Sequence, residues 1–284
     1  TPITLSSQAA AFASVDNDVG TFLSQGNAAL QSLLSGEKWS KISLTYSFNT
    51  SIPAEYAAVT SGSTPSGSLT SGWSALNETE KGVVRQALTK LVSLIPLTLT
   101  EVAGNAGDLR FNVIPTSGST TGFAYYPSAS WAIGGDVFLA SSSRSKYTYT
   151  PGDHAVLVAV HEIGHAMGLK HPFETPNVLD TALDDYTHTT MSYTSGRSML
   201  LDFTYSGGRV HVQGKYTANP SEYSLLDVAA LQAIYGANTS YRTGTDTYSI
   251  SYADRKYLTI WDAGGFDSMD GAAGMVTCTV DVLC

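Results

Sequence analysis

The sequence predicts an α+β fold, and three observations carry that prediction. Strand-like alternation of apolar and polar residues, as in Ile42–Phe48, occurs in the same chain as a helix-like apolar stripe after Asn77. Stretches rich in Ser, Thr, Gly and Pro separate these segments, which is typical of turns and loops. Hydrophobic residues make up 43% of the 284 positions, enough to bury a sizeable core.

The first third of the chain contains two helical patterns and one strand pattern. Apolar residues at helical spacing predict a helix over residues 18–36 that ends at Gly36. The alternation in Ile42–Phe48 predicts a half-buried strand, and residues 60–72 indicate a surface loop. A second helix begins near Asn77 and ends before Pro96, because the residue before a proline disfavours the helical conformation.

Strands and helices also follow one another in the rest of the chain. Strand candidates are Leu97–Val102, Asp108–Ile114, Gly122–Tyr126 and Gly135–Leu139. A third helix begins at Asp153, whose side chain suits an N-cap, and another spans residues 222–235 and ends at Gly236. Between these helices, residues 171–220 are expected to be irregular. From residue 241 onward we expect short strands and glycine turns, and no internal repeat indicates a solenoid.

The charge balance is acidic, with 15 Lys and Arg against 24 Asp and Glu, a net charge of −9. Such a surface argues against nucleic acid and anionic membranes as partners, and it is compatible with bound cations such as calcium. No stretch approaches the roughly 18 apolar residues of a membrane-spanning helix. Thr1–Leu5 show no basic region followed by an apolar run, so no uncleaved signal peptide is visible. The low charged fraction of 14% favours an extracellular protein.

The two cysteines, Cys278 and Cys284, both lie in the last seven residues. They cannot crosslink the core, and two cysteines do not make a disulfide framework. A small terminal bridge or two free thiols is the favoured interpretation, with catalysis or metal binding as the alternative.

The segment His161–His171 carries the strongest chemical signal. His161 and His165 are four residues apart, about one helical turn, so both rings project from one helix face and can bind one metal. Glu162 lies close enough to act on a water bound to that metal. The alternative is a helix with scattered histidines satisfied by hydrogen bonds. Three of the six histidines fall in this segment, which favours the metal site.

His171 requires a reversal of the chain. On a continuous helix it would lie about 15 Å from His161 along the axis. Three nitrogens that bind one zinc ion, each at about 2.0–2.1 Å, cannot be that far apart. Gly168 is positioned to end the helix, because glycine accepts the left-handed conformation of a helix C-terminus without steric cost. The spacing therefore predicts a zinc site with His161, His165 and His171 as ligands.

These eleven residues resemble the active-site motif of the metzincin zinc endopeptidases, which share a downstream Met-turn. Thr190–Tyr193 is similar to that turn. The resemblance implies that Met191 forms an apolar floor beneath the histidines. It also implies that Tyr193 can approach zinc as a fifth ligand, swing away and hydrogen-bond the developing oxyanion. A packed aromatic is the alternative for Tyr193. Matrixins typically have Pro at this position, so the chain does not resemble a matrixin.

Serralysins are the metzincins that the chain resembles most. His165–Pro172 is similar to their active-site segment, and Leu225–Asn238 resembles the helix that precedes their C-terminal domain. Arg242–Gly244 and Trp261–Asp267 resemble the segments that follow. The resemblance covers about residues 40–270. It implies a mixed twisted sheet with an active-site helix and further helices, followed by a short β-rich remnant. Astacins are the runner-up, but they typically have a disulfide-linked core.

The serralysin resemblance also implies a structural calcium site. Carried over by position, its ligands are Arg242, Gly244, Asp246, Asp262, Gly264 and Asp267. Backbone carbonyls of the first segment and aspartates of the second would supply oxygen donors, which suit a hard cation. The family has Thr where this chain has Asp246, and a backbone carbonyl survives that change. Without the resemblance, the glycines of the second segment would indicate an ordinary turn.

The expected domains are residues 1–240, a metzincin catalytic domain, and residues 241–284, which resemble the start of a serralysin C-terminal domain. Serralysins continue into glycine- and aspartate-rich calcium-binding repeats and an export signal, whereas this chain contains at most one degenerate repeat unit before Cys284. A truncated, a processed and a naturally short protein all remain open. The usual export route of the family is therefore open as well.

The resemblance implies a secreted zinc endopeptidase that acts on proteins or peptides, with Glu162 as general base and Tyr193 as oxyanion donor. We expect a monomer without membrane insertion, and a proteinaceous inhibitor is a candidate partner. One alternative is a catalytically inactive zinc-binding module, whose predicted mark would be the loss of Glu162. Another is a latent precursor blocked by an N-terminal segment, although residues 1–17 contain no cysteine for a cysteine-type block.

Metzincins bind substrate in extended form beside an edge strand. Gly122–Tyr126 and Asp136–Leu139 are the candidates, with an ordinary sheet strand as the alternative for each. The remaining polar residues carry weaker signals: His154 as a surface histidine, His188 as a loop histidine or a hydrogen-bond partner of the zinc site, His211 without a motif, and Asp184 and Asp185 as acidic residues before the Met-turn with no single role.

Overall fold

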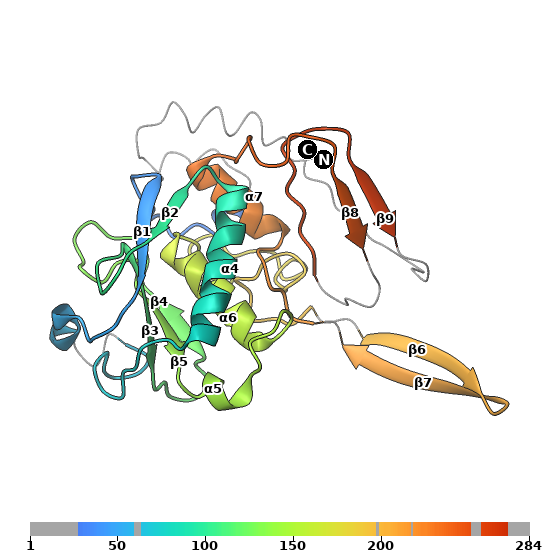
Figure 1. Ribbon diagram of the computed structural model, residues 1–284, viewed down its shortest axis with the longest axis horizontal. Coiled ribbons are helices and arrows are strands. Elements are labelled where there is room, and N and C mark those ends of the chain that lie inside the picture. Colours follow the sequence, from blue (N-terminus) through green and yellow to red (C-terminus); the bar gives the residue numbers. More distant parts are fainter. Residues whose placement is uncertain (1–27, 60–63, 197–198, 217, 251–256, 272–284) are drawn as a thin grey trace.

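The computed structural model describes residues 28–59, 64–196, 199–216, 218–250 and 257–271. A five-stranded sheet in the order β2-β1-β3-β5-β4 lies in the left part of the molecule in Figure 1. Its strands are β1 (Ser43–Phe48), β2 (Thr98–Glu101), β3 (Leu109–Ile114), β4 (Gly122–Ala124) and β5 (Val137–Ala140). Four strands run parallel, and β4 pairs antiparallel with β5 at one edge. This mixed sheet, with helices beside it, confirms the predicted α+β class.

Three helices pack around one another on one side of the sheet. α4 (Glu78–Leu94) contacts β2, and α6 (His154–Ala166) packs against β4, β5 and α4. α7 (Leu225–Tyr235) contacts α4 and the short helix α3 (Ala28–Gln31). Every α6 residue after His154 is buried, so this helix is the centre of the helical layer.

The two long helices begin where the sequence predicts. The Asn77 side chain accepts a hydrogen bond from the Glu80 backbone N–H at 3.0 Å, and the Glu80 carboxylate accepts one from the Asn77 N–H at 2.8 Å. This reciprocal pair is a capping box. At the start of α6, the Asp153 side chain accepts from the backbone N–H of Ala155 at 3.3 Å. A cap of this kind stabilises a helix by about 1 kcal/mol.

The other side of the sheet is covered by a 3₁₀ helix (Ala54–Ala58) and loops, with a small apolar cluster around Tyr56 and Phe138. Within it, the Arg110 guanidinium donates to both oxygens of Asp136, each at 2.8 Å. The Tyr56 hydroxyl donates to the same carboxylate at 2.7 Å. Burial raises the pKa of Asp136 to about 6 although Arg110 opposes that shift. The sheet is therefore covered on both faces.

The prediction of an irregular segment over residues 171–220 is wrong for its middle part. β6 (Met199–Ser206) and β7 (Arg209–Tyr216) form an antiparallel hairpin that projects from the body in Figure 1. Gly207 and Gly208 form its turn with φ of 58° and 73°, a conformation that glycine adopts without strain. Tyr205 and Val210, which pair across the strands, are 75% and 62% exposed.

The predicted helix over residues 18–36 differs from the described part of the chain. α3 contains four residues, and residues 18–27 lie outside the described ranges. Leu34 instead forms a β-bridge with Leu169, and the backbone N–H of Lys170 donates to the Leu33 carbonyl at 2.8 Å. The helix ends early because this backbone must pair with the segment that follows α6.

The remaining elements are short. α5 (Ser143–Lys146) follows β5, and β8 (Thr247–Ile250) pairs parallel with β9 (Ser268–Gly271) in the C-terminal segment, where short strands are expected. Residues 60–63 of the expected loop, and both Cys278 and Cys284, lie outside the described residues. Among the helices that are described, none has the length and apolar character needed to cross a membrane.

Candidate active site

The chain reverses at Gly168, immediately after α6. Gly168 has φ of 97°, and its N–H donates to the His165 carbonyl at 2.9 Å. The next N–H, of Leu169, donates to the Gly164 carbonyl at 2.9 Å, so the two bonds form a Schellman motif. A Cβ atom at Gly168 would lie 2.2 Å from the Glu37 carbonyl oxygen, so any larger residue would collide with the backbone. This reversal directs the chain back toward α6.

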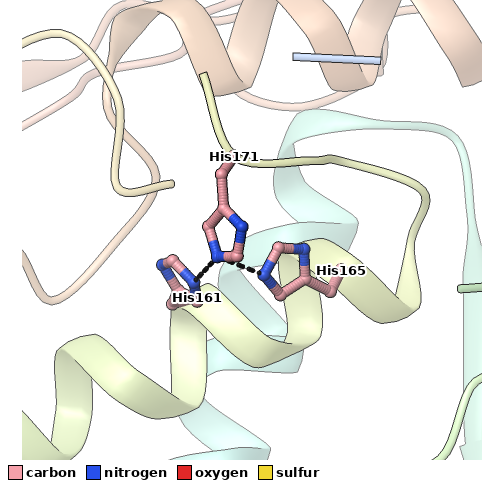
Figure 2. A group of neighbouring side chains, drawn as sticks. All are labelled: His161, His165 and His171. Atoms are coloured by element: carbon pink, nitrogen blue, oxygen red, sulfur yellow. Dashed lines mark hydrogen bonds between the residues drawn. The ribbon is translucent and has the colours of Figure 1, made fainter. Parts of the chain in front are cut away.

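Three histidine rings converge as a result (Figure 2). The Nε2 atom of His171 lies 3.2 Å from Nε2 of His161 and 3.0 Å from Nε2 of His165. His161 and His165 project from α6, whereas His171 approaches from the loop after the reversal. All three nitrogen atoms lie within 4.8 Å of one another.

The opposite ring nitrogen of each histidine faces an oxygen acceptor. These Nδ1 contacts are His161 to the Thr190 carbonyl at 2.8 Å, His165 to the Leu169 carbonyl at 2.7 Å, and His171 to Oε1 of Glu174 at 2.6 Å. Carbonyl and carboxylate oxygens accept hydrogen bonds, so Nδ1 carries the proton of each neutral ring. Burial lowers the pKa of His161 to about 4 and that of His165 well below its usual value, which favours the neutral form.

This tautomer assignment leaves three lone pairs that point at one another. In this tautomer the Nε2 lone pairs of the rings face one another across the two contacts dashed in Figure 2. Tetrahedral zinc with Zn–N bonds of 2.0–2.1 Å places its nitrogen ligands about 3.3 Å apart, close to the observed separations. Outward acceptors at Nδ1 are also the usual partners of zinc-bound histidines. The histidine group therefore fits a zinc site.

Met191, the expected apolar floor of the site, is fully buried. A Cβ atom at Gly164 would come within 2.7 Å of the Met191 sulfur, so the glycine between Ile163 and His165 allows the turn to pack directly against α6. Met191 is thus an apolar contact of the helix that carries two of the histidines.

Asp227 of α7 is fully buried and binds Thr189 and Thr190, the two residues that precede Met191. Its carboxylate accepts hydrogen bonds from the hydroxyls of Thr189 and Thr190, from the Thr190 backbone N–H at 2.7 Å and from the Ser224 N–H at 2.9 Å. Burial raises the pKa of Asp227 to about 6. Because the Thr190 carbonyl binds Nδ1 of His161, α7 is connected to a histidine ring through one residue.

Glu162 lies beside the histidines and is 5% exposed. Its Oε2 atom has no hydrogen-bond partner among the described residues, and burial raises the pKa of the carboxyl to about 8. β4 passes directly against it. A Cβ atom at Gly122 would lie 2.9 Å from Oε1 of Glu162 and 2.8 Å from Val158, so glycine alone permits this close approach.

Aromatic rings flank the histidines on the exposed side. The Tyr193 ring centroid lies 4.7 Å from that of His171 and 5.8 Å from that of His161, and Tyr193 is 65% exposed. Phe173 stacks on His171 at 5.1 Å, and Tyr126 meets His165 edge-on at 5.7 Å. Partial desolvation and the nearby carboxylates of Glu162 and Glu174 raise the pKa of Tyr193 to about 12, so the O–H remains a donor near neutral pH.

The aspartates of the expected calcium site also come together, with carboxylate oxygens of Asp246, Asp262 and Asp267 within 4.8 Å of one another. Asp262 accepts from the Gly264 N–H at 2.9 Å and from the Tyr248 hydroxyl, and these bonds lower its pKa. None of the three makes an ion pair with a lysine or arginine of the described chain.

The other expected ligands of this site belong to its two turns. Arg242 has a left-handed backbone with φ of 49°, and its guanidinium lies 4.9 Å from the Tyr248 ring. A Cβ atom at Gly265 would lie 1.7 Å from the Gly244 carbonyl oxygen, so the two turns touch through glycine. Gly264 has φ of 149° and donates to Asp262 as described above.

The remaining candidates lie away from the histidine group. His154 begins α6 and contacts the Tyr147 ring at 5.3 Å, and His211 is exposed on β7. His188 pairs with Asp185 at 2.9 Å, whereas Oδ1 of Asp184 is buried without a partner among the described residues.

Of the two strand candidates for substrate binding, β4 lies at the sheet edge. Asp136–Leu139 contributes to β5, which pairs on both sides and cannot accept a further strand.

Sequence reasoning missed Glu174 and the role of Asp227, and it named Gly122 only as the start of a strand candidate. Glu174 follows His171 by three residues, a spacing that could have indicated a local partner. Asp227 lies in the segment that resembles the serralysin helix, but its contact with the Met-turn depends on tertiary packing. Nothing local to Gly122 indicates that it touches Glu162.

Comparison with known proteins agrees with this geometry. Residues 70–194 match the family model of the matrixins. Metalloprotease AprA of Pseudomonas entomophila is 28% identical over 258 residues, covering 81% of this chain and 49% of the relative. Serralysin of Proteus mirabilis is 32% identical over 231 residues (68% and 44%), and serralysin C of Dickeya chrysanthemi is 31% identical over 247 residues (73% and 46%). The chain is a serralysin-like metzincin.

The match to the matrixin model corrects the expectation, drawn from Tyr193, that the chain does not resemble a matrixin. The chain spans about half the length of the curated relatives it matches. The similarity therefore concerns the part of those proteins that corresponds to the sheet, the helical layer and the histidine site.

Proposed function

We propose that this serralysin-like metzincin is a secreted zinc-dependent endopeptidase that hydrolyses peptide bonds in proteins. The observation that carries the proposal is the convergence of three imidazole nitrogens beside the buried carboxylate of Glu162, whose Oε2 atom has no hydrogen-bond partner among the described residues. His161, His165 and His171 would hold the metal and leave one coordination position open, as in catalytic zinc sites. Zinc bound there supplies Lewis acidity toward a water and a peptide carbonyl.

Glu162 is the proposed general base. Its Oε2 atom, which has no hydrogen-bond partner among the described residues, can take a proton from the attacking water and deliver it to the leaving amine. A divalent cation next to this carboxyl favours its ionised form and opposes the effect of burial on its pKa. The neutral Tyr193 hydroxyl then donates a hydrogen bond to the developing oxyanion. Its exposure leaves the ring free to approach the reacting carbonyl.

The edge of β4 is the proposed substrate strand partner. The Thr121 carbonyl accepts from the Ala140 N–H, and the Tyr125 N–H donates to the Asp136 carbonyl, each at 3.0 Å. Because strand residues alternate, Gly122 and Ala124 direct their N–H and C=O groups toward the free edge. An extended substrate that pairs there lies next to Glu162, because Gly122 touches that side chain.

The same proposal includes a structural calcium ion, the two domains (residues 1–240 and 241–284) and export from the cell. Three carboxylates without a lysine or arginine partner among the described residues support the calcium site, since oxygen donors of this density suit a hard cation. The substrates are proteins or peptides. A proteinaceous inhibitor and a monomeric state belong to the proposal as well.

Glu162→Gln tests the proposed activity against the zinc-binding-module alternative. We expect casein hydrolysis to fall by about 10²- to 10⁴-fold with bound zinc unchanged, because Gln cannot take a proton. Glu78→Gln is the matched control, since Glu78 is 81% exposed on α4, and it should retain wild-type activity. Wild-type turnover in Glu162→Gln would contradict the role of Glu162. A wild-type protein that binds zinc without any chelator-sensitive hydrolysis would favour the binding module.

A further inference from the structure

His171 is the member of the histidine group that α6 does not hold. His161 and His165 have their backbones in the helix, and their Nδ1 atoms bind main-chain carbonyls. His171 lies in the loop after the reversal, where a ring must be fixed by other means. Residues 170–177 supply those means with side-chain contacts.

Glu174 holds the His171 ring from its outer side. Its Oε1 atom lies 2.6 Å from Nδ1 of His171, and its backbone N–H donates to the His171 carbonyl at 3.2 Å, so side chain and turn act together. Phe173 stacks on the same ring with an interplanar angle of 7°. Glu174 is the charged acceptor among the three Nδ1 partners, and a charged acceptor forms the stronger hydrogen bond.

Lys170 holds the backbone of the same loop. The residue is 6% exposed, and its Nζ atom donates to the carbonyls of Glu174 at 2.7 Å, His171 at 3.3 Å and Asn177 at 3.4 Å. It forms no ion pair with a carboxylate of the described residues. A buried ammonium is costly unless its donors are satisfied, and here three carbonyls of one loop satisfy it. The ammonium therefore acts as a fixed cation around which the loop closes.

We propose that Glu174 and Lys170 are positioning residues that set the zinc affinity of the site by fixing His171 before the metal binds. Glu174 fixes the tautomer and the orientation of the ring, and its charge makes Nε2 a better donor to a metal. Lys170 fixes the loop from which both residues project. The inference rests on the zinc site of the proposed function but not on peptide hydrolysis.

The test measures the zinc dissociation constant of the full chain by competition with a chromophoric chelator. Glu174→Ala should weaken zinc binding by about 10- to 100-fold, the usual effect of losing a partner of a metal-bound histidine. Glu174→Gln should restore part of the affinity, because its amide oxygen still accepts from Nδ1 without the charge. Lys170→Met should also weaken binding, and Lys170→Arg, which keeps a buried cation, should weaken it less.

Asp185→Asn is the matched control. Asp185 pairs with His188 at 2.9 Å across three residues, the same spacing as Glu174 and His171, but His188 lies outside the histidine group. Its zinc affinity should equal that of the wild type. Urea unfolding of each zinc-free variant separates a loss of affinity from a loss of fold, and the Gln and Arg variants serve if the Ala or Met variant does not fold.

The possible results are distinct. Wild-type zinc affinity in the folded Glu174 variants would overturn the role of Glu174, and the same result in the folded Lys170 variants would overturn that of Lys170. Equal loss in Glu174→Ala and Asp185→Asn would also overturn it, because the effect would then be unspecific. Failure of the wild-type protein to bind zinc would instead contradict the proposed function itself.

Discussion

The histidine cluster and the aspartate cluster each bring three ligand atoms within 4.8 Å of one another, yet their surroundings differ. The histidines are mostly buried, and each has its second nitrogen fixed by an oxygen acceptor. The aspartates are more exposed, lie between two glycine turns, and accept hydrogen bonds from backbone N–H groups and a tyrosine.

This difference suits the two clusters to the two kinds of metal in the proposed function. Nitrogen lone pairs in a buried site repel one another with little screening, so the site is stiff and suits a small cation of fixed geometry. Carboxylates near solvent are screened, and their oxygen ligands adapt to the variable geometry of calcium. One cluster is therefore suited to chemistry and the other to holding two turns together.

Loss of one ligand from each cluster should have very different effects on activity. His165→Ala removes a buried zinc ligand, so we expect bound zinc to disappear and casein hydrolysis to fall by several orders of magnitude. Asp262→Asn should leave zinc content and turnover close to wild type at saturating calcium. Metal analysis and a peptidase assay on both variants check the comparison, which fails if Asp262→Asn loses as much zinc as His165→Ala.

The two clusters also differ in how far local sequence predicts them. The i, i+4 spacing of His161 and His165 and the reversal at Gly168 follow from helix geometry. The expected calcium ligands follow only from the family resemblance. Aspartates in glycine turns are common, so the local sequence alone does not indicate a metal site. Contacts between distant segments were not predictable: Gly122 meets Glu162 because β4 pairs with β5 over α6, and no local pattern encodes that approach.

The β6–β7 hairpin was missed for a different reason. Gly207-Gly208 between two stretches of alternating residues is a recognised hairpin signal, and it lies inside a segment interpreted as irregular after the Met-turn. Most of the described core, by contrast, follows from apolar periodicity and caps such as Asn77, because burial of one face determines each element. Long-range polar contacts, such as Asp227 with the Met-turn, require the fold.

Gly122→Ala should show how closely the buried cluster depends on the sheet edge. The added methyl group would lie 2.9 Å from Glu162, so the carboxylate must move. A displacement of about 1 Å in a catalytic group can cost about 10²-fold in rate, and we expect kcat to fall by that order with zinc content unchanged. Gly82→Ala in α4, where a Cβ meets no atom within 4 Å, is the control and should retain wild-type kcat. Equal kcat in both variants would show that the contact between Gly122 and Glu162 does not position the carboxylate.

The buried aspartate Asp227 should make the stability of the fold depend on pH. The folded-state pKa of Asp227 is raised from 3.8 to about 6, so its contribution to stability is fully present below pH 3.8 and is lost as pH rises through 6. This shift corresponds to about 3 kcal/mol. The free energy of unfolding of the wild type should therefore fall relative to Asp227→Asn between pH 4 and 6. Zinc-free urea unfolding of both proteins measures it, and a constant difference across that range would contradict the shift.

The smallest expected effect is the contribution of calcium to stability. A cation that binds the folded chain and not the unfolded chain raises Tm by mass action, and a gain of about 1 kcal/mol corresponds to about 2–4 °C for a domain of this size. We expect a calcium-dependent rise of that order in the wild type, measured at fixed zinc, and its loss in Asp262→Asn. Asp180→Asn, a carboxylate outside the aspartate cluster, should keep the full calcium response. A response that survives in Asp262→Asn would place the stabilising calcium elsewhere, and the two glycine turns would then be held by their hydrogen bonds alone.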